Sequence, residues 1–168
     1  SAQAPEPAKV SISFDAPATD LKAPVDENRN RCSWVNKTPQ LVIARNDLAK
    51  TKAVLSIQGA AATTACSIRD ITGMIVMAER TVTNTMQLPL LPRGTYLLDA
   101  RLLDTAGQVL DFASTAFRVE SKLYIKEVKT AKDAYAPGEK ITGTVNFSVP
   151  VPLRGHQIKV RAVDTWGR

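Results

Sequence analysis

The chain has 168 residues, of which 44% are hydrophobic and 23% are charged, and its formal net charge is +6. This composition excludes a wholly disordered chain. No apolar run approaches the roughly 18–20 residues that cross a bilayer, so the sequence also predicts no membrane span.

The excess of basic residues does not by itself indicate a nucleic-acid partner. The chain has 22 Lys and Arg against 16 Asp and Glu, but they are spread along the sequence. Aromatic residues make up only 5% and are not interleaved with basic runs in a way that would stack bases. We therefore expect a generic basic surface and no nucleic-acid binding.

The N-terminal residues 1–8 are rich in Pro and Ala and are predicted to be a mobile segment. Their small residues are similar to those that border a signal-peptidase cleavage site, and the alternative is a sequence appended for expression. The first alternative predicts a secreted protein, extracellular or periplasmic.

Period-two alternation of apolar and polar residues predicts a series of short strands. They are 10–14, 41–43, 53–58, 66–70, 74–79, 85–88, 96–103, 108–112 and 116–119. A long loop is expected at 15–31, and a single helical turn at 46–52. Turn signals about every ten residues favour an all-β fold, an immunoglobulin-like β-sandwich over residues 9–120.

After a junction at 120–122 the alternation starts again, with strands predicted at 123–128, 141–147 and 158–163. The spacing indicates the first half of a second β-sandwich over residues 121–168. Its strands are too few to close a sandwich, so the prediction is a partial unit.

An internal repeat supports this division. The pattern D-x-x-G occurs at 70–73, 104–107 and 164–167, each time after an alternating run. The pair of segments 53–57 and 68–73 resembles the pair 141–145 and 162–167, so the second copy is expected to end within its hairpin turn. Its inner face would need strands from the remainder of the parent polypeptide or from a second chain.

Two cysteines, Cys32 and Cys66, are the only ones in the chain, and their separation fits no C-x-x-C zinc or redox motif. Two alternatives stay open. They are both buried thiols, or they form one disulfide in an exported protein, which would add roughly 3–4 kcal/mol of stability in the chain-entropy model.

The sequence contains no pattern that predicts catalysis. There is no G-x-S-x-G motif, and the one histidine, His156, is expected to be solvated in a loop. Asp99, Asp104 and Asp111 are interpreted as solvent-face or turn residues rather than an acid–base pair. We therefore expect no catalytic residues, no cofactor, no metal site and no enzymatic activity in this chain.

Aromatic side chains are the remaining candidates for contact with a ligand. Trp34 and Tyr96 are expected in the sandwich core. Trp166, in a predicted turn, and Tyr135, in a predicted loop, are the candidates for a ligand or an interface.

Two segments carry a family resemblance. Residues 91–107, with L-x-x-G-x-Y and D-x-x-G, and then Phe117-Arg118-Val119 resemble the last strands of immunoglobulin-like domains in bacterial secreted polysaccharide-degrading enzymes. Residues 135–141, Y-x-P-G-E-x-I, resemble the start of such accessory domains and of macroglobulin-type domains. None of the matched positions is catalytic in those domains.

The resemblance implies a non-catalytic accessory or spacer region of a larger secreted protein, an extracellular glycoside hydrolase acting on polysaccharide. A carbohydrate-binding module is one alternative. A macroglobulin-like or adhesive interaction domain is another.

Overall fold

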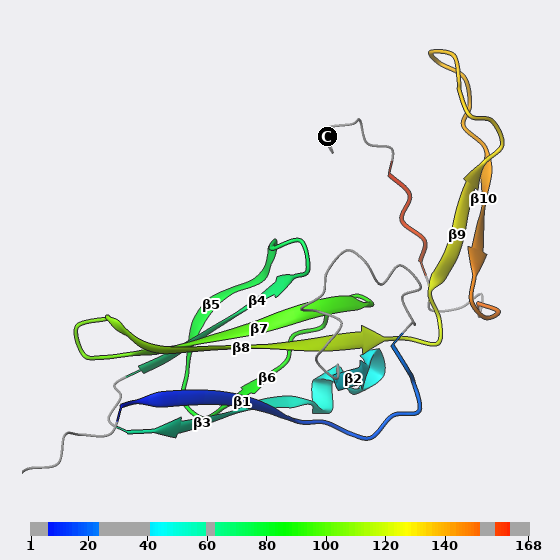
Figure 1. The fold of residues 1–168 in the computed structure, drawn as a ribbon. Helices are drawn as coiled ribbons and strands as arrows, with labels where there is room; N and C mark the ends of the chain where they lie inside the picture. Colours follow the sequence, from blue (N-terminus) through cyan, green and yellow to red (C-terminus); the bar gives the residue numbers. More distant parts are fainter. Residues whose placement is uncertain (1–6, 24–40, 60–62, 152–156, 162–168) are drawn as a thin grey trace, which may run out of the picture. The chain divides into compact units, whose positions relative to one another are not determined.

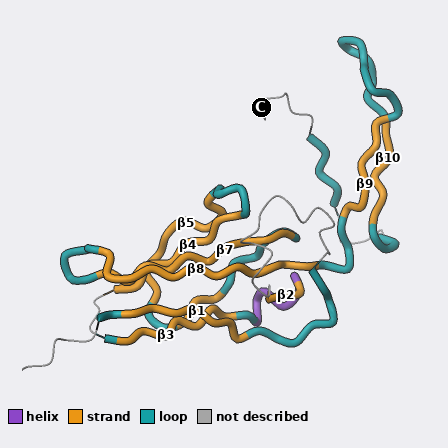
Figure 2. Tube along the Cα trace, in the orientation of Figure 1, coloured by secondary structure: helices purple, strands orange, loops and turns teal. Residues whose placement is uncertain are grey.

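The computed structural model describes residues 7–23, 41–59, 63–151 and 157–161. The chain divides into two compact units, Ser1–Ser121 and Lys122–Arg168. Each unit is described by itself. The first is an all-β sandwich, with one short helix, and the second contains a two-stranded hairpin (Figures 1 and 2).

A three-stranded antiparallel sheet forms one layer of the first unit. Its order is β1-β3-β6, with β1 at Lys9–Asp15, β3 at Lys52–Gln58 and β6 at Thr85–Gln87. β1 and β3 pair over seven positions, which aligns Val10 with Ile57 and Ile12 with Leu55. The apolar residues of both strands therefore share one face.

A five-stranded sheet forms the second layer, in the order β2-β8-β7-β4-β5. The strands are β2 at Leu41–Ala44, β4 at Thr63–Asp70, β5 at Ile75–Val82, β7 at Gly94–Leu103 and β8 at Val109–Glu120. All neighbours are antiparallel except β2, which runs parallel to β8. In the view of Figure 1, β4, β5, β7 and β8 of this sheet lie above β1 and β3 of the three-stranded sheet.

The strand order is that of an immunoglobulin-like sandwich. The sheet β1-β3-β6 follows the A-B-E order, and β5-β4-β7-β8 follows C′-C-F-G. The all-β sandwich predicted for this part of the chain is therefore confirmed.

The core lies between the two sheets and is organised around β7. Tyr96, Leu98, Ala100 and Leu102 alternate along this strand and are all buried. Phe117 on β8 is fully buried, with its ring centroid 5.3 Å from Phe14 on β1 and 5.7 Å from Tyr96. These rings join the two layers, which is how aromatic side chains contribute both area and geometry to a core.

Tyr96 explains the L-x-x-G-x-Y motif. Its hydroxyl donates a 3.0 Å hydrogen bond to the carbonyl of Pro92, just before β7 begins. This is the tyrosine corner of immunoglobulin-like folds. A Cβ at Gly94 would lie 3.3 Å from the Tyr96 hydroxyl, so the glycine leaves room for the ring.

The first two D-x-x-G turns have the same geometry. The Asp104 carboxylate accepts hydrogen bonds from the N–H groups of Ala106 and Gln108, both at 2.8 Å. The turn requires a positive φ at its last position, and Gly107 supplies it with a φ of +79°. Asp70 accepts from Thr72 and Met74 in the same way, before Gly73. The predicted turns are therefore confirmed, and the third, at 164–167, lies outside the described residues.

A 3₁₀ helix, η1 at Arg45–Lys50, connects the two sheets between β2 and β3. It coincides with the predicted helical turn. The side chain of Leu48, in the middle of this helix, is buried. The Gln87 side-chain amide donates hydrogen bonds to the backbone carbonyls of Leu48 and Thr51, at 2.8 and 2.7 Å. The connection is therefore packed into the sandwich rather than solvated.

The second unit contains β9 at Ile125–Thr130 and β10 at Gly143–Phe147, paired antiparallel. Residues 157–161 form no strand, which corrects the strand predicted at 158–163 over this range. None of the described strands pairs with them, and an alternating sequence forms a strand only when a neighbour accepts its backbone hydrogen bonds.

One further difference concerns β8. The sequence predicts two strands, at 108–112 and 116–119, but the structure has one continuous strand from Val109 to Glu120. The small residues 113–116 break the apolar alternation. Pairing with β7 carries the strand through them.

The tyrosine corner gives the first testable prediction. Replacing Tyr96 with Phe removes the hydroxyl and leaves the Pro92 carbonyl without this donor, so we expect a loss of about 1 kcal/mol in the free energy of unfolding. Urea unfolding monitored by circular dichroism measures it. Ser13→Ala, which removes an exposed hydroxyl, is the control and should change stability far less. Equal effects of the two substitutions would contradict the role given to Tyr96.

Candidate interaction surfaces

The outer face of the five-stranded sheet, turned away from the core, carries paired charges. Asp99 lies on this face of β7 and is only 9% exposed. Its carboxylate accepts 2.6 Å hydrogen bonds from Arg69 Nε on β4 and from Ser114 Oγ on β8. The sequence placed Asp99 on a solvent face, and this is corrected: the side chains of the neighbouring strands surround it.

A second ion-pair cluster lies at the end of the same face. Glu120 accepts from Arg93 Nε at 2.6 Å and from Arg118 Nε at 2.7 Å, and Arg118 also donates to the Thr95 hydroxyl at 2.9 Å. Burial tends to raise the pKa of Glu120, but the two guanidinium groups outweigh it and hold the pKa below its ordinary value. The carboxylate is therefore charged and held in place.

A third pair joins Arg101 on β7 with Glu79 on β5. The carboxylates of Asp99, Glu120 and Glu79 are thus all in contact with guanidinium groups. Two of the pairs link β7 or its end to the adjacent strand, and the third reaches over β4, from Arg101 on β7 to Glu79 on β5. Each carboxylate is held by an arginine, whereas a glycosidase places two carboxyl groups on either side of the bond that it cleaves.

An apolar patch occupies the end of the β7–β8 hairpin. Val109, Leu110 and Phe112 on β8 are each exposed by 44–54%, and we call them the hairpin-tip patch. Phe112 pairs with Arg101 across the strands. Of the described aromatic side chains, it is the one classed as exposed.

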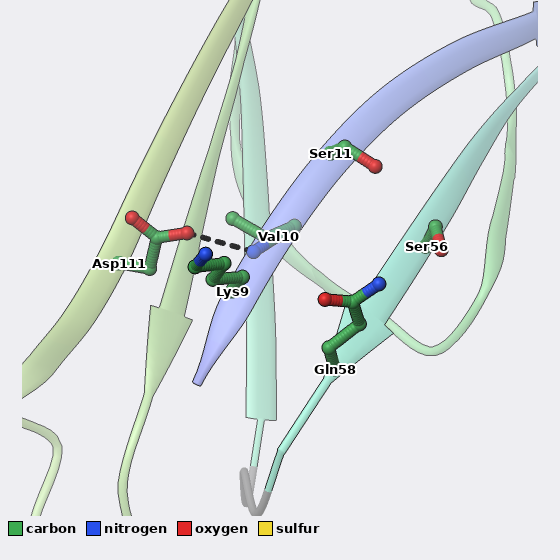
Figure 3. Close-up of a pocket in the computed structure, with 6 residues that line it drawn as sticks. All are labelled: Lys9, Val10, Ser11, Ser56, Gln58 and Asp111. Carbon is green, nitrogen blue, oxygen red and sulfur yellow. Dashed lines mark hydrogen bonds between the residues drawn. The ribbon is translucent and has the colours of Figure 1, made fainter. Parts of the chain in front are cut away.

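A small polar pocket of about 240 Å³ lies where β1 and β3 approach β8 (Figure 3). It is lined by Lys9, Val10, Ser11, Ser56, Gln58 and Asp111. The Asp111 carboxylate accepts a 2.7 Å hydrogen bond from the Val10 backbone N–H, shown dashed in Figure 3. This bond links β8 of one sheet to β1 of the other. It also lowers the pKa of Asp111, because it stabilises the charged form.

The β9–β10 hairpin has one apolar face. Val128 pairs with Val145, and Ile125 pairs with Phe147. Val145 and Phe147 lie two residues apart on β10, and a register shift between Asn146 and Phe147 brings Ile125 opposite Phe147. We call these four residues the apolar hairpin face. Ile125 is 52% and Val128 65% exposed, so this face is largely uncovered.

Tyr135 closes the loop between β9 and β10. Its hydroxyl accepts from the Lys132 N–H at 3.2 Å and donates to the Thr142 carbonyl at 2.9 Å. Glu139 forms an ion pair with Lys132 and accepts from the Ala136 N–H at 3.0 Å. The hydroxyl thus holds the loop, and contact between the ring and a ligand stays a prediction.

The Y-x-P-G-E motif follows from this loop. The Glu139 N–H donates to the Ala136 carbonyl at 3.0 Å across Pro137-Gly138, and Gly138 has a φ of +81°. Proline followed by a glycine with positive φ is typical of a type II turn. The motif therefore specifies a loop conformation.

Several predicted residues lie outside the described residues: Cys32, Trp34, His156 and Trp166. Cys66 is buried, and burial raises the pKa of its thiol to about 11. The pairing of Cys32 with Cys66 stays a prediction.

Within the described ranges, no three His, Cys, Asp or Glu side chains gather as they would around a metal ion. In the same part of the chain, no helix has the length and apolarity needed to cross a membrane.

Sequence reasoning missed the ion pairs of the outer face. Arg69 and Asp99 are 30 positions apart, and their contact depends on the register between β4 and β7. The alternation of Asp99 and Arg101 with the apolar residues of β7 was the available signal. It indicates a polar face but not which charges meet.

Comparison with known proteins identifies similarity to solved structures. No family model matches the chain, and no curated protein is significantly similar to it. It is similar to a solved structure described as the crystal structure of CopC from Methylosinus trichosporium OB3b, with 19% sequence identity and a TM-score of 0.39. The match covers 60% of this chain and 93% of that one. A likeness of this size carries no argument about function.

The bond between the sheets predicts a pH dependence. Because the pKa of Asp111 is below its ordinary value of 3.8 in the folded chain, the carboxylate stabilises the fold above about pH 4, and this is lost as the pH falls through the folded-state pKa. Asp111→Asn should therefore lower the melting temperature at neutral pH and have less effect near pH 2.5. Asp133→Asn, at an exposed site, is the control. A difference that stays constant with pH would refute the assignment.

The cysteines give a chemical prediction. A buried thiol with a pKa of about 11 has almost no thiolate at pH 8, so Cys66 should resist iodoacetamide until the chain is unfolded. A Cys32→Ser variant isolates Cys66, and intact mass measures the alkylation. In the wild-type chain, unfolding without reductant should expose two thiols if both are free and none if they are bonded. Rapid alkylation of the folded variant would contradict the burial.

Proposed function

We propose that this chain is a non-catalytic accessory region that spaces or orients a neighbouring domain of a larger secreted protein. The observation that carries the proposal is the tandem arrangement of a sandwich and a hairpin with an uncovered apolar face. An exposed apolar face of this kind can be buried against a neighbouring domain of a larger protein.

The connection between the two units supports this function. β8 ends at Glu120 and β9 begins at Ile125, so only Ser121–Tyr124 lie between them. Lys122 and Tyr124 are already bonded to Ser148 of the second unit, so the segment that joins the units is short. Short connections of this kind suit a region whose role is to set a distance.

The use of the acidic residues supports a non-catalytic role. Asp70 and Asp104 accept backbone N–H bonds in turns, Asp111 links the sheets, and Asp99 and Glu120 bind guanidinium groups. Each of these carboxylates stabilises the fold. A general acid instead needs a carboxyl whose pKa is raised towards the working pH.

The parent protein that we propose is an extracellular glycoside hydrolase acting on polysaccharide. The support for this is the resemblance of the segments 91–119 and 135–141 to the accessory domains of such enzymes. The same resemblance underlies the proposed secretion.

A carbohydrate-binding module is the second candidate, and one observation favours it. Phe112 is 54% exposed on the outer face and lies opposite Arg101, which pairs with Glu79. An exposed ring beside polar groups is an arrangement that can stack on a sugar. One ring gives a small platform, so we place this function second.

A co-sedimentation assay separates the two functions. If the chain is a spacer, residues 1–168 should release no reducing sugar from insoluble cellulose, chitin or xylan and should stay in the supernatant. If it binds carbohydrate, it should sediment with one of these polymers, and Phe112→Ala should abolish the binding.

Leu110→Ala, in the same hairpin-tip patch but without a ring, is the matched control. Sedimentation that depends on Phe112 and not on Leu110 would replace the spacer function with carbohydrate binding. Release of reducing sugar by the purified chain would overturn the non-catalytic proposal itself.

A further inference from the structure

The turn that joins β4 to β5 carries four large apolar side chains that face solvent. Ile71, Met74, Ile75 and Val76 are exposed by 59%, 67%, 56% and 41%, and we call these four residues the β4–β5 tip. At ordinary side-chain areas, these fractions amount to about 400 Å² of apolar surface, which lies within the roughly 300–600 Å² of the largest patch on a typical monomer. Patches of that size are often functional.

The backbone of this turn matches that of the β7–β8 turn. The Asp70 carboxylate accepts hydrogen bonds from the N–H groups of Thr72 and Met74, at 2.9 and 3.0 Å. The Asp104 carboxylate accepts from the N–H groups two and four residues later, both at 2.8 Å. In each turn the glycine N–H also donates to the carbonyl of the Asp, at 3.0 and 3.1 Å. The two turns therefore make the same demands on the chain.

Their side chains differ at two exposed positions. Ile71 and Met74 stand where the β7–β8 turn has Thr105 and Gln108, and all four residues are exposed. Because polar residues serve the same backbone geometry at these positions, the turn itself does not require Ile71 and Met74 to be apolar. Exposed apolar side chains without a part in the fold point to contact with another molecule.

The β4–β5 tip lies at the margin of the five-stranded sheet, because β5 has no neighbour on its outer side among the described strands. Figure 1 shows the turn between β4 and β5 projecting from the sheet. β5 has two register shifts against β4, and such bulges oppose continuous pairing with a further strand. Contact at the tip is therefore a matter of side-chain packing rather than of a shared backbone ladder.

The charges of this region favour a second copy of the chain over a lipid surface. Residues 71–78 contain no charged side chain, so two tips can pack together without burying a charge. Apolar segments that bind lipid are flanked by Lys and Arg, but residues 63–82 contain no Lys. Of the two arginines in this range, Arg69 is paired with Asp99, which leaves Arg80.

We propose that the β4–β5 tip is an interface between two copies of this chain, in which each tip packs against the other about a two-fold axis. Two tips bury about 800 Å² in total, and the exposed Thr72 and Gly73 bring this near roughly 1,000 Å², the low end for a specific interface. A two-fold contact uses the same patch on both copies, so association ends at the dimer. This inference goes beyond the proposed spacer function and does not depend on it.

Sedimentation velocity of residues 1–168 tests the dimer. An interface of this size is weak, so we expect monomer at about 10 µM and dimer above about 100 µM. Ile71→Thr combined with Met74→Gln copies the side chains of the β7–β8 turn, so the fold should be kept while association weakens at least about tenfold. A chain that stays monomeric at about 1 mM, or a variant that dimerises as the wild type does, would overturn the proposal.

Two variants at other apolar patches are the matched controls. Leu110→Ser changes the hairpin-tip patch and Val128→Thr changes the apolar hairpin face, and both should leave the dimer unchanged. Loss of the dimer in either variant, with the β4–β5 tip intact, would reject this interface. Binding to phosphatidylcholine–phosphatidylglycerol vesicles by a chain that remains monomeric would instead assign the tip to lipid.

Cross-linking locates the contact directly. In the Cys32→Ser background, Met74→Cys places a thiol near the proposed two-fold axis, and mild oxidation at about 200 µM should give a disulfide-linked dimer on a non-reducing gel. Gln108→Cys places a thiol at the equivalent position of the β7–β8 turn and should stay monomeric. Equal cross-linking of the two variants would show random collision and would refute the interface.

Discussion

Packing of the alternate side chains of β7 against the three-stranded sheet is the interaction on which the first unit depends. Tyr96, Leu98, Ala100 and Leu102 form the middle of the core, and β7 pairs with β4 on one side and β8 on the other. A slip of one residue in β7 would place this stripe on the outer face and Asp99 in the core. Register is therefore the quantity that the rest of the fold must protect.

Two kinds of contact protect it. The Asp70 and Asp104 turns fix where the strands of each hairpin begin to pair, since each carboxylate accepts hydrogen bonds from the backbone N–H groups two and four residues later. The contact between Arg69 and Asp99 depends on the observed register, because these residues lie on the adjacent strands β4 and β7. Charged residues thus specify the alignment that the apolar residues stabilise.

Two antiparallel strand pairs, β1–β3 and the β9–β10 hairpin, illustrate how little a strand pair decides by itself. β1–β3 and β9–β10 obey the same alternation, and both have a polar opposite face. The first is part of a core because β4, β7 and β8 cover it, and the second is not covered by any described strand.

The sequence by itself determined the local elements: alternation marked most of the strands, and D-x-x-G marked two hairpin turns. These depend on residues within a few positions of one another, so a single stretch of chain contains the information. The tertiary structure decided what depends on distant residues. It merged two predicted strands into β8, left 157–161 without a partner, and brought Arg69 to Asp99 and Asp111 to Val10. Register and coverage are set by which strands lie side by side, and alternation along one strand is the same whether or not another sheet lies upon it.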